Sequence, residues 1–379
     1  MPENKKLKHL GNLTARKFLK DFWQKQPLLI RGGFDDNFSN LTLDNLIRYS
    51  QDPKCSTRFI RREGSRYSVR YGPVSQKFIK SLPKQGWTFL VQGINYVDRR
   101  AAALLQKFSF LPYARLDDVM VSFSAPGGSV GPHFDSYDVF LVQGNGRRTW
   151  QVSSQHDGQL INDSDLKILK NFSSEGHCTL EKGDILYLPP HFAHHGVGDS
   201  DAFTFSIGFR APDFTKLKVD FLDYLDGKKF IEKIYTDPNI LPTKYPAKIP
   251  SKLVRDTNQI LESLRWDKDD IHIFLGENLS LSDNDFQDNT SPKTIDWKTF
   301  KKRLDKELYE INPSVRMMYL GNYFFIAGRT FTLKKETASD FRRIADSRSL
   351  GEPDSLHAET KKILFEFAKH NWILLRLSD

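Results

Sequence analysis

Two histidine-containing segments of this sequence have the residue types and spacing of a metal site. His133 and Asp135 lie two residues apart in Gly-Pro-His-Phe-Asp, and residues two apart on a strand project from one face, so both can bind one ion. Further along, the apolar run that starts at Gly183 enters Pro189-Pro190 and then supplies three histidines. Two histidines and one carboxylate form the ligand set that leaves positions on Fe(II) open for a co-substrate and O2.

Spacing alone does not select the third ligand. His191, His194 and His195 crowd the corner that follows the two prolines. A second His-x-carboxylate pair, His357-Ala358-Glu359, lies in a stretch of helical period. Residues two apart on a helix project about 200° from each other, so that pair is excluded as a metal site.

An arginine follows the His-x-Asp pair by one strand. Gly144-Asn145-Gly146 predicts a tight turn between two strands, and Arg147 and Arg148 come directly after it. Because arginine pairs with carboxylates in a bidentate manner, an arginine beside an open iron site indicates a co-substrate with a terminal carboxylate. The alternative is that both arginines are solvated charges of the hairpin.

The strand before the pair alternates polar and apolar residues. One face carries Asp118, Met120, Ser122 and Ser124, and the other carries Val119, Val121 and Phe123. Polar side chains facing the interior of a barrel are costly unless they are used. We therefore expect this face to serve a binding site; the alternative is that Asp118 is a loop acid in front of the strand.

The elements that must position these residues are short strands. From about residue 86 onward, strand-like runs are separated by Gly, Pro and polar turns, at residues 88–94, 119–125, 139–143, 149–153, 185–188 and 202–209. Short strands separated by frequent turns are typical of a β-sandwich or a closed β-barrel. In front of it we expect a helix at 15–23 and a strand at 28–30.

The pattern changes after Pro212. Residues 214–234 and 251–265 have a helical period and are separated by a proline-rich stretch, and the polar residues 279–292 indicate a linker. The remaining residues fit a small α+β module, with a helix at 297–309, hairpin-like strands at 317–326 and 329–333, and two further helical stretches.

Composition limits the classes of protein and hints at a partner. The 379 residues contain no apolar run long enough for a membrane span and no signal-peptide core at the N-terminus. Only two cysteines are present, which excludes a disulfide framework. We therefore expect a cytoplasmic protein. The net charge is +9, and residues 1–100 hold 20 Lys and Arg against 8 Asp and Glu. The densest block is Arg58, Arg61, Arg62, Arg66 and Arg70. It either faces nucleic acid or a ribonucleoprotein, or is a solvated surface without a partner.

The ordered set of motifs resembles the Jumonji C ribosomal oxygenases. The resemblance rests on Trp23-Gln-Lys-Gln-Pro-Leu-Leu-Ile, on residues 126–144 around Gly-Pro-His-Phe-Asp, on Gly183-Asp-Ile-Leu-Tyr-Leu-Pro-Pro and on Ser206-Ile-Gly-Phe-Arg-Ala-Pro. It covers most of residues 1–212 and is closest to the bacterial branch, which hydroxylates an arginine of large-subunit ribosomal protein sixteen.

The resemblance implies an α+β fold built on a double-stranded β-helix (a jelly-roll, or cupin, barrel). Residues 1–212 would form the oxygenase domain, with its barrel core at about 86–212. Residues 213–285 would form a helical dimerisation segment of a homodimer, and 286–379 a winged-helix-like domain.

The resemblance also assigns residues. The family's Pro-Pro-x-Phe-x-His corner falls on residues 189–194 and selects His194, which would hold Fe(II) together with His133 and Asp135. Arg148 would bind 2-oxoglutarate. The hydroxyls of Ser206, Ser122 and Ser124 would assist that binding, and Asp118, Met120 and Tyr137 would form the substrate pocket.

The expected activity is an Fe(II)-, 2-oxoglutarate- and O2-dependent hydroxylation of an arginine β-carbon in a ribosomal protein. One alternative is a Jumonji C oxygenase acting on a histidine or a methyl-lysine. Another is a non-catalytic ribonucleoprotein-binding module that uses the basic block and the winged helix.

Overall fold

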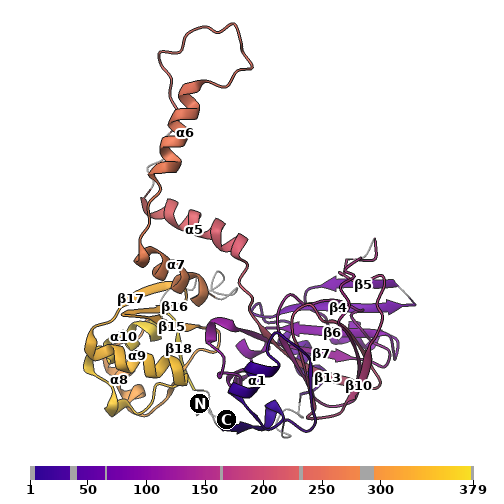
Figure 1. Cartoon of the computed structure of the whole chain (residues 1–379). Coiled ribbons are helices and arrows are strands. Elements are labelled where there is room, and N and C mark those ends of the chain that lie inside the picture. The colour runs from indigo at the N-terminus through magenta and orange to yellow at the C-terminus, as the bar shows by residue number, and fades with distance from the viewer. Residues whose placement is uncertain are drawn as a thin grey trace.

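The computed structural model describes residues 5–34, 41–64, 66–162, 165–229, 234–281 and 294–376. A strand-rich N-terminal body and a smaller C-terminal body lie side by side, and helices connect them (Figure 1). Most of the expected linker at 279–292 falls outside the described residues. Its first residues, Leu279 and Ser280, instead form the last turn of a helix.

An eight-stranded sheet forms the base of the N-terminal body. Its order is β3-β11-β8-β13-β7-β6-β4-β5, and every pairing is antiparallel. The strands, in chain order, are β3 (Leu28–Ile30), β4 (Ser56–Glu63), β5 (Arg66–Tyr71), β6 (Trp87–Gln92), β7 (Leu116–Ser124), β8 (Val139–Gln143), β11 (Ile185–Leu188) and β13 (Ala202–Phe209). The last three strands have the predicted bounds.

A three-stranded sheet faces the large one and completes the double-stranded β-helix. Its order is β10-β9-β12, with β9 at Arg148–Ser153, β10 at Gly176–Leu180 and β12 at Ala193–Gly198. A cavity between the two sheets is lined by side chains of both, such as Met120 and Ser206 from the large sheet and Trp150 from the small one. The predicted barrel is therefore present.

The barrel core begins earlier in the chain than the expected residue 86. β4 and β5 extend the large sheet beyond β6, and β3 pairs with β11 at the opposite edge. The basic block is this β4–β5 hairpin. Its strand character is hidden in the sequence because arginines occupy both faces of the hairpin, so the alternation of polar and apolar residues is lost.

The face of the large sheet that points away from the cavity packs on an aromatic core. This core includes Phe18, Phe108, Phe140 and Phe209, each less than 2% exposed. Phe18 comes from α1 (Ala15–Asp21), which begins where Thr14 Oγ1 accepts a hydrogen bond from Lys17 N. The other N-terminal elements are β1 (Lys6–Leu7), β2 (Leu13–Thr14), α2 (Leu43–Tyr49), α3 (Gln76–Lys80) and α4 (Arg99–Gln106).

Helices and a second core make up the rest of the chain. The elements are α5 (Phe214–Lys229), α6 (Ser251–Ser263), α7 (Lys268–Ser280), α8 (Trp297–Leu304), β14 (Tyr309–Ile311), β15 (Met317–Leu320), β16 (Tyr323–Ile326), β17 (Arg329–Thr332), α9 (Lys335–Ser347), α10 (Ala358–Lys369) and β18 (Ile373–Leu375). The expected helix at 297–309 ends at Leu304, since Tyr309 already belongs to a strand. Of the expected helix at 214–234, residues 230–233 are not described.

The sequence did not predict α7, which packs on the C-terminal strands. A Cβ at Gly276 would lie 2.2 Å from Phe325 Cζ, so only glycine allows α7 to approach β16 this closely. Thr330 on β17 donates a hydrogen bond to Glu277 (2.6 Å). Within the described part of the chain, no helix has the length and apolar character needed to cross a bilayer.

Candidate active site

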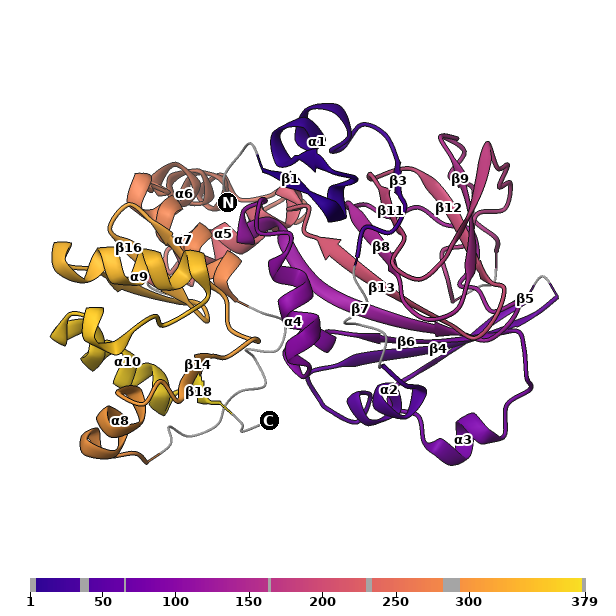
Figure 2. The ribbon, with the colours of Figure 1, turned by 90° about the horizontal axis from the view of Figure 1, so that it is seen from below.

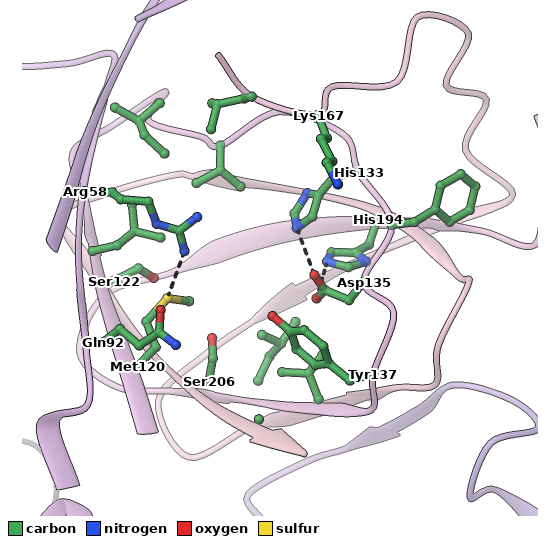
Figure 3. A pocket seen from close by; sticks show the side chains of 18 of the residues that line it. Arg58, Gln92, Met120, Ser122, His133, Asp135, Tyr137, Lys167, His194 and Ser206 are labelled. Carbon is green, nitrogen blue, oxygen red and sulfur yellow. Dashed lines mark hydrogen bonds and ion pairs between the residues drawn. The ribbon is translucent and has the colours of Figure 1, made fainter. Parts of the chain in front are cut away.

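Three side chains converge at one end of the cavity (Figure 3). His133 lies in the segment between β7 and β8, and His194 lies on β12; their backbones exchange two hydrogen bonds, of 3.0 and 2.9 Å. Nε2 of His133 is 3.9 Å from Asp135 Oδ1, and Nε2 of His194 is 3.6 Å from Asp135 Oδ2. One ligand atom from each residue lies within 4.8 Å of the other two, which is the geometry of a metal site.

Backbone carbonyls orient both imidazole rings. Nδ1 of His133 lies 2.9 Å from the Gly131 carbonyl oxygen, and Nδ1 of His194 lies 3.0 Å from that of Phe192. These contacts place the proton on Nδ1 and leave the Nε2 lone pairs directed at the shared point, as is usual for metal-binding histidines. Burial, followed by the neighbouring His133, lowers the pKa of His194 to about 4. His194 is therefore neutral at pH 7, the form that binds a metal.

The other two histidines of the corner point elsewhere. His191 is exposed, has a φ of +66°, and uses its backbone N–H to donate to the Asp135 carbonyl oxygen (3.1 Å). His195 follows His194 on the same strand and so faces the opposite side, where its Nδ1 is 3.2 Å from Gln151 Oε1. Among the three histidines, only His194 belongs to the cluster with Asp135.

Arg148 lies deep in the same cavity, where it is 2% exposed. Its guanidinium donates to Ser122 Oγ (3.0 Å) and to the Gly196 carbonyl oxygen (3.3 Å), and it stacks over Trp150 at 4.7 Å. A Cβ at Gly196 would come within 2.8 Å of Arg148 Nε, so the glycine makes room for the arginine. Burial lowers the pKa of Arg148 to about 10, and its Nε has no hydrogen-bond partner among the described residues. The group therefore favours an anionic ligand.

Apart from Ser124, the remaining predicted residues line the same cavity, whose volume is about 390 Å³. Met120 and Ser206 lie at the end away from the metal cluster, whereas Tyr137 lies beside Asp135 (Figure 3). Asp118 is buried on β7 rather than in a loop, and its Oδ2 accepts a hydrogen bond from Gly93 N (2.8 Å). Met120 Sδ lies 3.8 Å from Arg58, and Ser206 adds a hydroxyl. Tyr137 is 42% exposed, and the charge of Asp135 raises the pKa of its phenol.

Ser124 is the predicted site residue that does not line this cavity. Its hydroxyl is 3.0 Å from that of Thr88 and donates to the Gly128 carbonyl oxygen (3.2 Å). It shares a face of β7 with Ser122, but the strand has already left the cavity at this point. Ser124 is therefore a buried structural hydroxyl.

Several lining residues were not singled out from the sequence. They are Arg58, Gln92, Asp117, Trp150 and Lys167. Arg58 was noticed only as part of the basic block. The register of β4 places Arg58 on the same face as Ile60, which also lines the cavity, but no alternation in the sequence indicates this. Gln92, Asp117 and Lys167 carry no local signal either, because they reach the cavity from segments far apart in the chain.

Comparison with known proteins agrees with this architecture. A family model described as "JmjC domain" matches residues 103–217. The ribosomal protein uL16 3-hydroxylase of Escherichia coli K12 is 36% identical to this chain over 247 residues. The chain belongs to the JmjC family.

The alignments with curated JmjC relatives are partial in length. That with the E. coli protein covers 65% of this chain and 66% of the relative. The probable ribosomal oxygenase of Haemophilus influenzae, also 36% identical, is matched over 54% of this chain and 52% of its own length. The sequence matches thus span between half and two thirds of these relatives.

A solved JmjC structure matches nearly the whole chain. The E. coli ribosomal oxygenase YcfD, in complex with cobalt and 2-oxoglutarate, superposes with a TM-score of 0.76 at 26% identity, covering 96% of this chain and 99% of YcfD. The resemblance to the Jumonji C ribosomal oxygenases and the predicted cupin fold are confirmed.

Proposed function

We propose that this JmjC protein is an Fe(II)- and 2-oxoglutarate-dependent protein hydroxylase. The observation that carries the proposal is one cavity holding two kinds of group. His133, Asp135 and His194 cluster at one point, and the buried, uncompensated Arg148 lies beside them. The first group suits a divalent metal, and the second suits the carboxylate of a co-substrate.

The residues present fit both ligands. Two imidazoles and one carboxylate would hold Fe(II), which with 2-oxoglutarate and O2 would supply the oxidising chemistry that replaces a C–H bond by C–OH. Arg148, with the hydroxyls of Ser122 and Ser206 nearby, binds the distal carboxylate of 2-oxoglutarate. Trp150 and the surrounding strands keep bulk water away from that arginine, so its charge acts in a medium of low dielectric constant.

The substrate we infer is an arginine of large-subunit ribosomal protein sixteen, hydroxylated on its β-carbon. The support is the name of the E. coli relative together with the second end of the cavity. The Asp118 carboxylate offers opposite charge to a guanidinium, while Met120 and Tyr137 form walls for its methylene groups. A ribosomal substrate also implies action in the cytoplasm.

The remainder of the chain supports an assembly in which residues 1–212 carry the chemistry. We propose that 213–285 dimerises two copies, because α5 and α6 expose apolar side chains such as Leu222 (50%), Val254 (49%) and Leu261 (60%). Residues 286–379 would form a winged-helix-like domain. Their three helices and short strands pack around their own core, which includes Phe324, Phe341 and Phe367.

The β4–β5 hairpin is a candidate for contact with ribosomal RNA. Register divides its arginines between two faces: Arg58 and Arg62 share the cavity side, and the opposite side carries Arg61, Arg66 and Arg70. Arg62 lies 5.9 Å from the Tyr67 ring, an arrangement of cation and aromatic group that suits phosphates and bases. Arg62→Glu should weaken binding of a ribosomal RNA fragment and flatten its salt dependence. An unchanged affinity would leave the hairpin as a solvated surface.

A mass-spectrometric turnover assay tests the activity. The protein, Fe(II), ascorbate and 2-oxoglutarate are incubated with peptides of the ribosomal protein, beside His133→Ala and Arg148→Ala. The expected result is the gain of one oxygen atom on an arginine, absent in both variants. Metal-dependent succinate release without that gain would keep the oxygenase and reject the substrate. In that case peptides presenting histidine or methyl-lysine are tested next. Neither signal, with metal bound, would favour the ribonucleoprotein-binding module.

A further inference from the structure

The first residues of β7 lack a neighbouring strand on one side. β6 ends at Gln92 and pairs with β7 only from Val121 onward. Before that point, side chains supply the hydrogen bonds between the two segments. Asn95 Oδ1 accepts a hydrogen bond from Val119 N (2.8 Å), and Asp118 Oδ2 accepts one from Gly93 N (2.8 Å). The segment that carries Asp118 is thus held by side-chain hydrogen bonds rather than by a continuous series of backbone hydrogen bonds to a neighbouring strand.

The pairing on the other side of this segment is also interrupted. β13 follows β7 down to the Ile207–Val119 pair, and the register then shifts before Phe209 meets Leu116. Residues 117 and 118 therefore lie opposite an irregularity. Backbone hydrogen bonds alone leave their position weakly determined on both sides.

Asp117 is held both by Arg210, which directly follows barrel strand β13, and by Arg316 from outside the barrel. Its Oδ1 accepts hydrogen bonds from Arg210 Nε (2.8 Å) and from Arg316 (3.3 Å), and its carbonyl oxygen accepts from Arg316 (3.2 Å). Arg316 precedes β15 in the C-terminal domain, and its other terminal nitrogen donates to the Leu281 carbonyl oxygen (3.2 Å). Its side chain is only 11% exposed. One arginine therefore joins the end of α7, the C-terminal domain and the start of β7.

We propose that Arg316 is a positioning residue through which the C-terminal domain fixes the substrate end of the active-site cavity. It holds Asp117, which lines the cavity, and thereby sets the position of the adjacent Asp118. The domain thus acts on the reaction of the N-terminal barrel from outside it. The expected change in peptide KM rests on the proposed function. The expected effect of Arg316 on the position of β7 does not.

The chain supplies a matched control at the same domain boundary. Arg99 at the start of α4 pairs with Glu310 on β14 at 2.7 Å. α4 lies on the side of the large sheet that faces the C-terminal domain (Figure 2). Neither residue of this pair lines the active-site cavity. Loss of the Arg99–Glu310 ion pair therefore weakens the domain boundary while the contact between Arg316 and Asp117 stays in place.

The structural test is hydrogen–deuterium exchange of the full chain, with wild type, Arg316→Ala, Arg316→Lys and Arg99→Ala compared. We expect faster exchange in peptides covering 93–97 and 116–120 for Arg316→Ala, partial recovery for Arg316→Lys, and no change there for Arg99→Ala. Equal exchange in Arg316→Ala and wild type overturns the proposal, as does an equal increase in Arg99→Ala. If Arg316→Ala does not fold, Arg316→Gln replaces it, and the same comparison decides.

The kinetic test separates this role from general destabilisation. In Arg316→Ala the KM for the peptide substrate should rise about fivefold or more, while 2-oxoglutarate turnover without peptide stays within about twofold of wild type. An unchanged peptide KM, or an equal loss of both activities, contradicts the proposal. If wild type shows no turnover of any kind, the proposed function fails, and the exchange experiment still decides whether Arg316 positions β7.

Discussion

The two ends of the cavity are built in different ways. At the metal end, His133 and His194 are tied by reciprocal backbone hydrogen bonds, their rings are oriented by carbonyls two residues away, and His194 is 3% exposed. At the substrate end, Asp118 and its neighbours are held by side chains from other segments, and Tyr137 is 42% exposed. Backbone pairing inside the barrel determines the first end, whereas side-chain contacts from other segments determine the second.

This difference indicates that the two ends of the cavity have different structural requirements. A metal site tolerates little displacement of its ligands, so its rigid support comes from the barrel itself. A site for a protein side chain must open toward solvent to admit the substrate, and it draws on whichever elements surround the opening. Changes at the metal end should therefore abolish the reaction, and changes at the substrate end should alter recognition.

The largest effect is expected at the metal end. His194→Ala removes a ligand, and 2-oxoglutarate turnover should fall by at least about a thousandfold together with metal content. His195→Ala is the matched control, because that ring faces Gln151 on the other side of β12, and it should retain turnover within about twofold. Turnover and metal analysis of both variants make the check. Equal losses in the two would contradict the assignment of His194.

A smaller effect is expected at Arg148, which lies buried in the same cavity. Arg148→Lys keeps a positive charge but not the fork that can donate to Ser122, Gly196 and a carboxylate together. The KM for 2-oxoglutarate should rise by about ten- to a hundredfold. Initial rates at varied 2-oxoglutarate measure it, and the peptide KM serves as the internal control. A normal KM for 2-oxoglutarate would mean that another group binds the co-substrate.

The substrate end should respond more mildly. Asp118→Asn retains an acceptor for Gly93 N–H, so the fold is kept while the charge is lost. The KM for an arginine peptide should rise about tenfold, with turnover of 2-oxoglutarate alone unchanged. Met120→Leu, of similar volume, is the control and should change the peptide KM little. If Asp118→Asn binds the peptide normally, the acid does not recognise the guanidinium.

The smallest effect concerns stability and pH. Burial lowers the pKa of His194 from 6.5 to about 4, so between these values the unfolded chain binds more protons than the folded one. Stability of the metal-free protein should therefore fall as the pH drops from 6.5 toward 4. Replacing the group in His194→Gln should reduce the loss between pH 7 and pH 5 by roughly 2 kcal/mol. Urea unfolding at the two pH values measures this, and an identical loss in the variant would count against a buried neutral imidazole.

The sequence predicted much of the metal end. The bounds of β8, β11 and β13 and the His-x-Asp pair follow from patterns within a few residues. Alternation along β7 likewise predicted that Asp118, Met120 and Ser122 share one face, and all three line the cavity. These features were accessible because strand periodicity is a local property of the chain.

Other features depended on the folded chain. Spacing did not choose among His191, His194 and His195. The structure selects His194, because among these three histidines only His194 pairs with His133, in an isolated antiparallel bridge. Alternation placed Ser124 with Ser122, yet only tertiary packing shows that it lies beyond the cavity.

The contact between Arg316 and Asp117 shows most clearly what the sequence leaves open. Its partners are separated by 199 positions in the chain. Periodicity and spacing report which face a residue occupies on its own element, so they predicted several barrel strands and pointed to the His133–Asp135 pair, although this pair lies between β7 and β8 rather than on a strand. Which elements meet at the substrate end is decided only when the two bodies of the protein pack together, because that contact depends on their relative orientation and not on any local pattern.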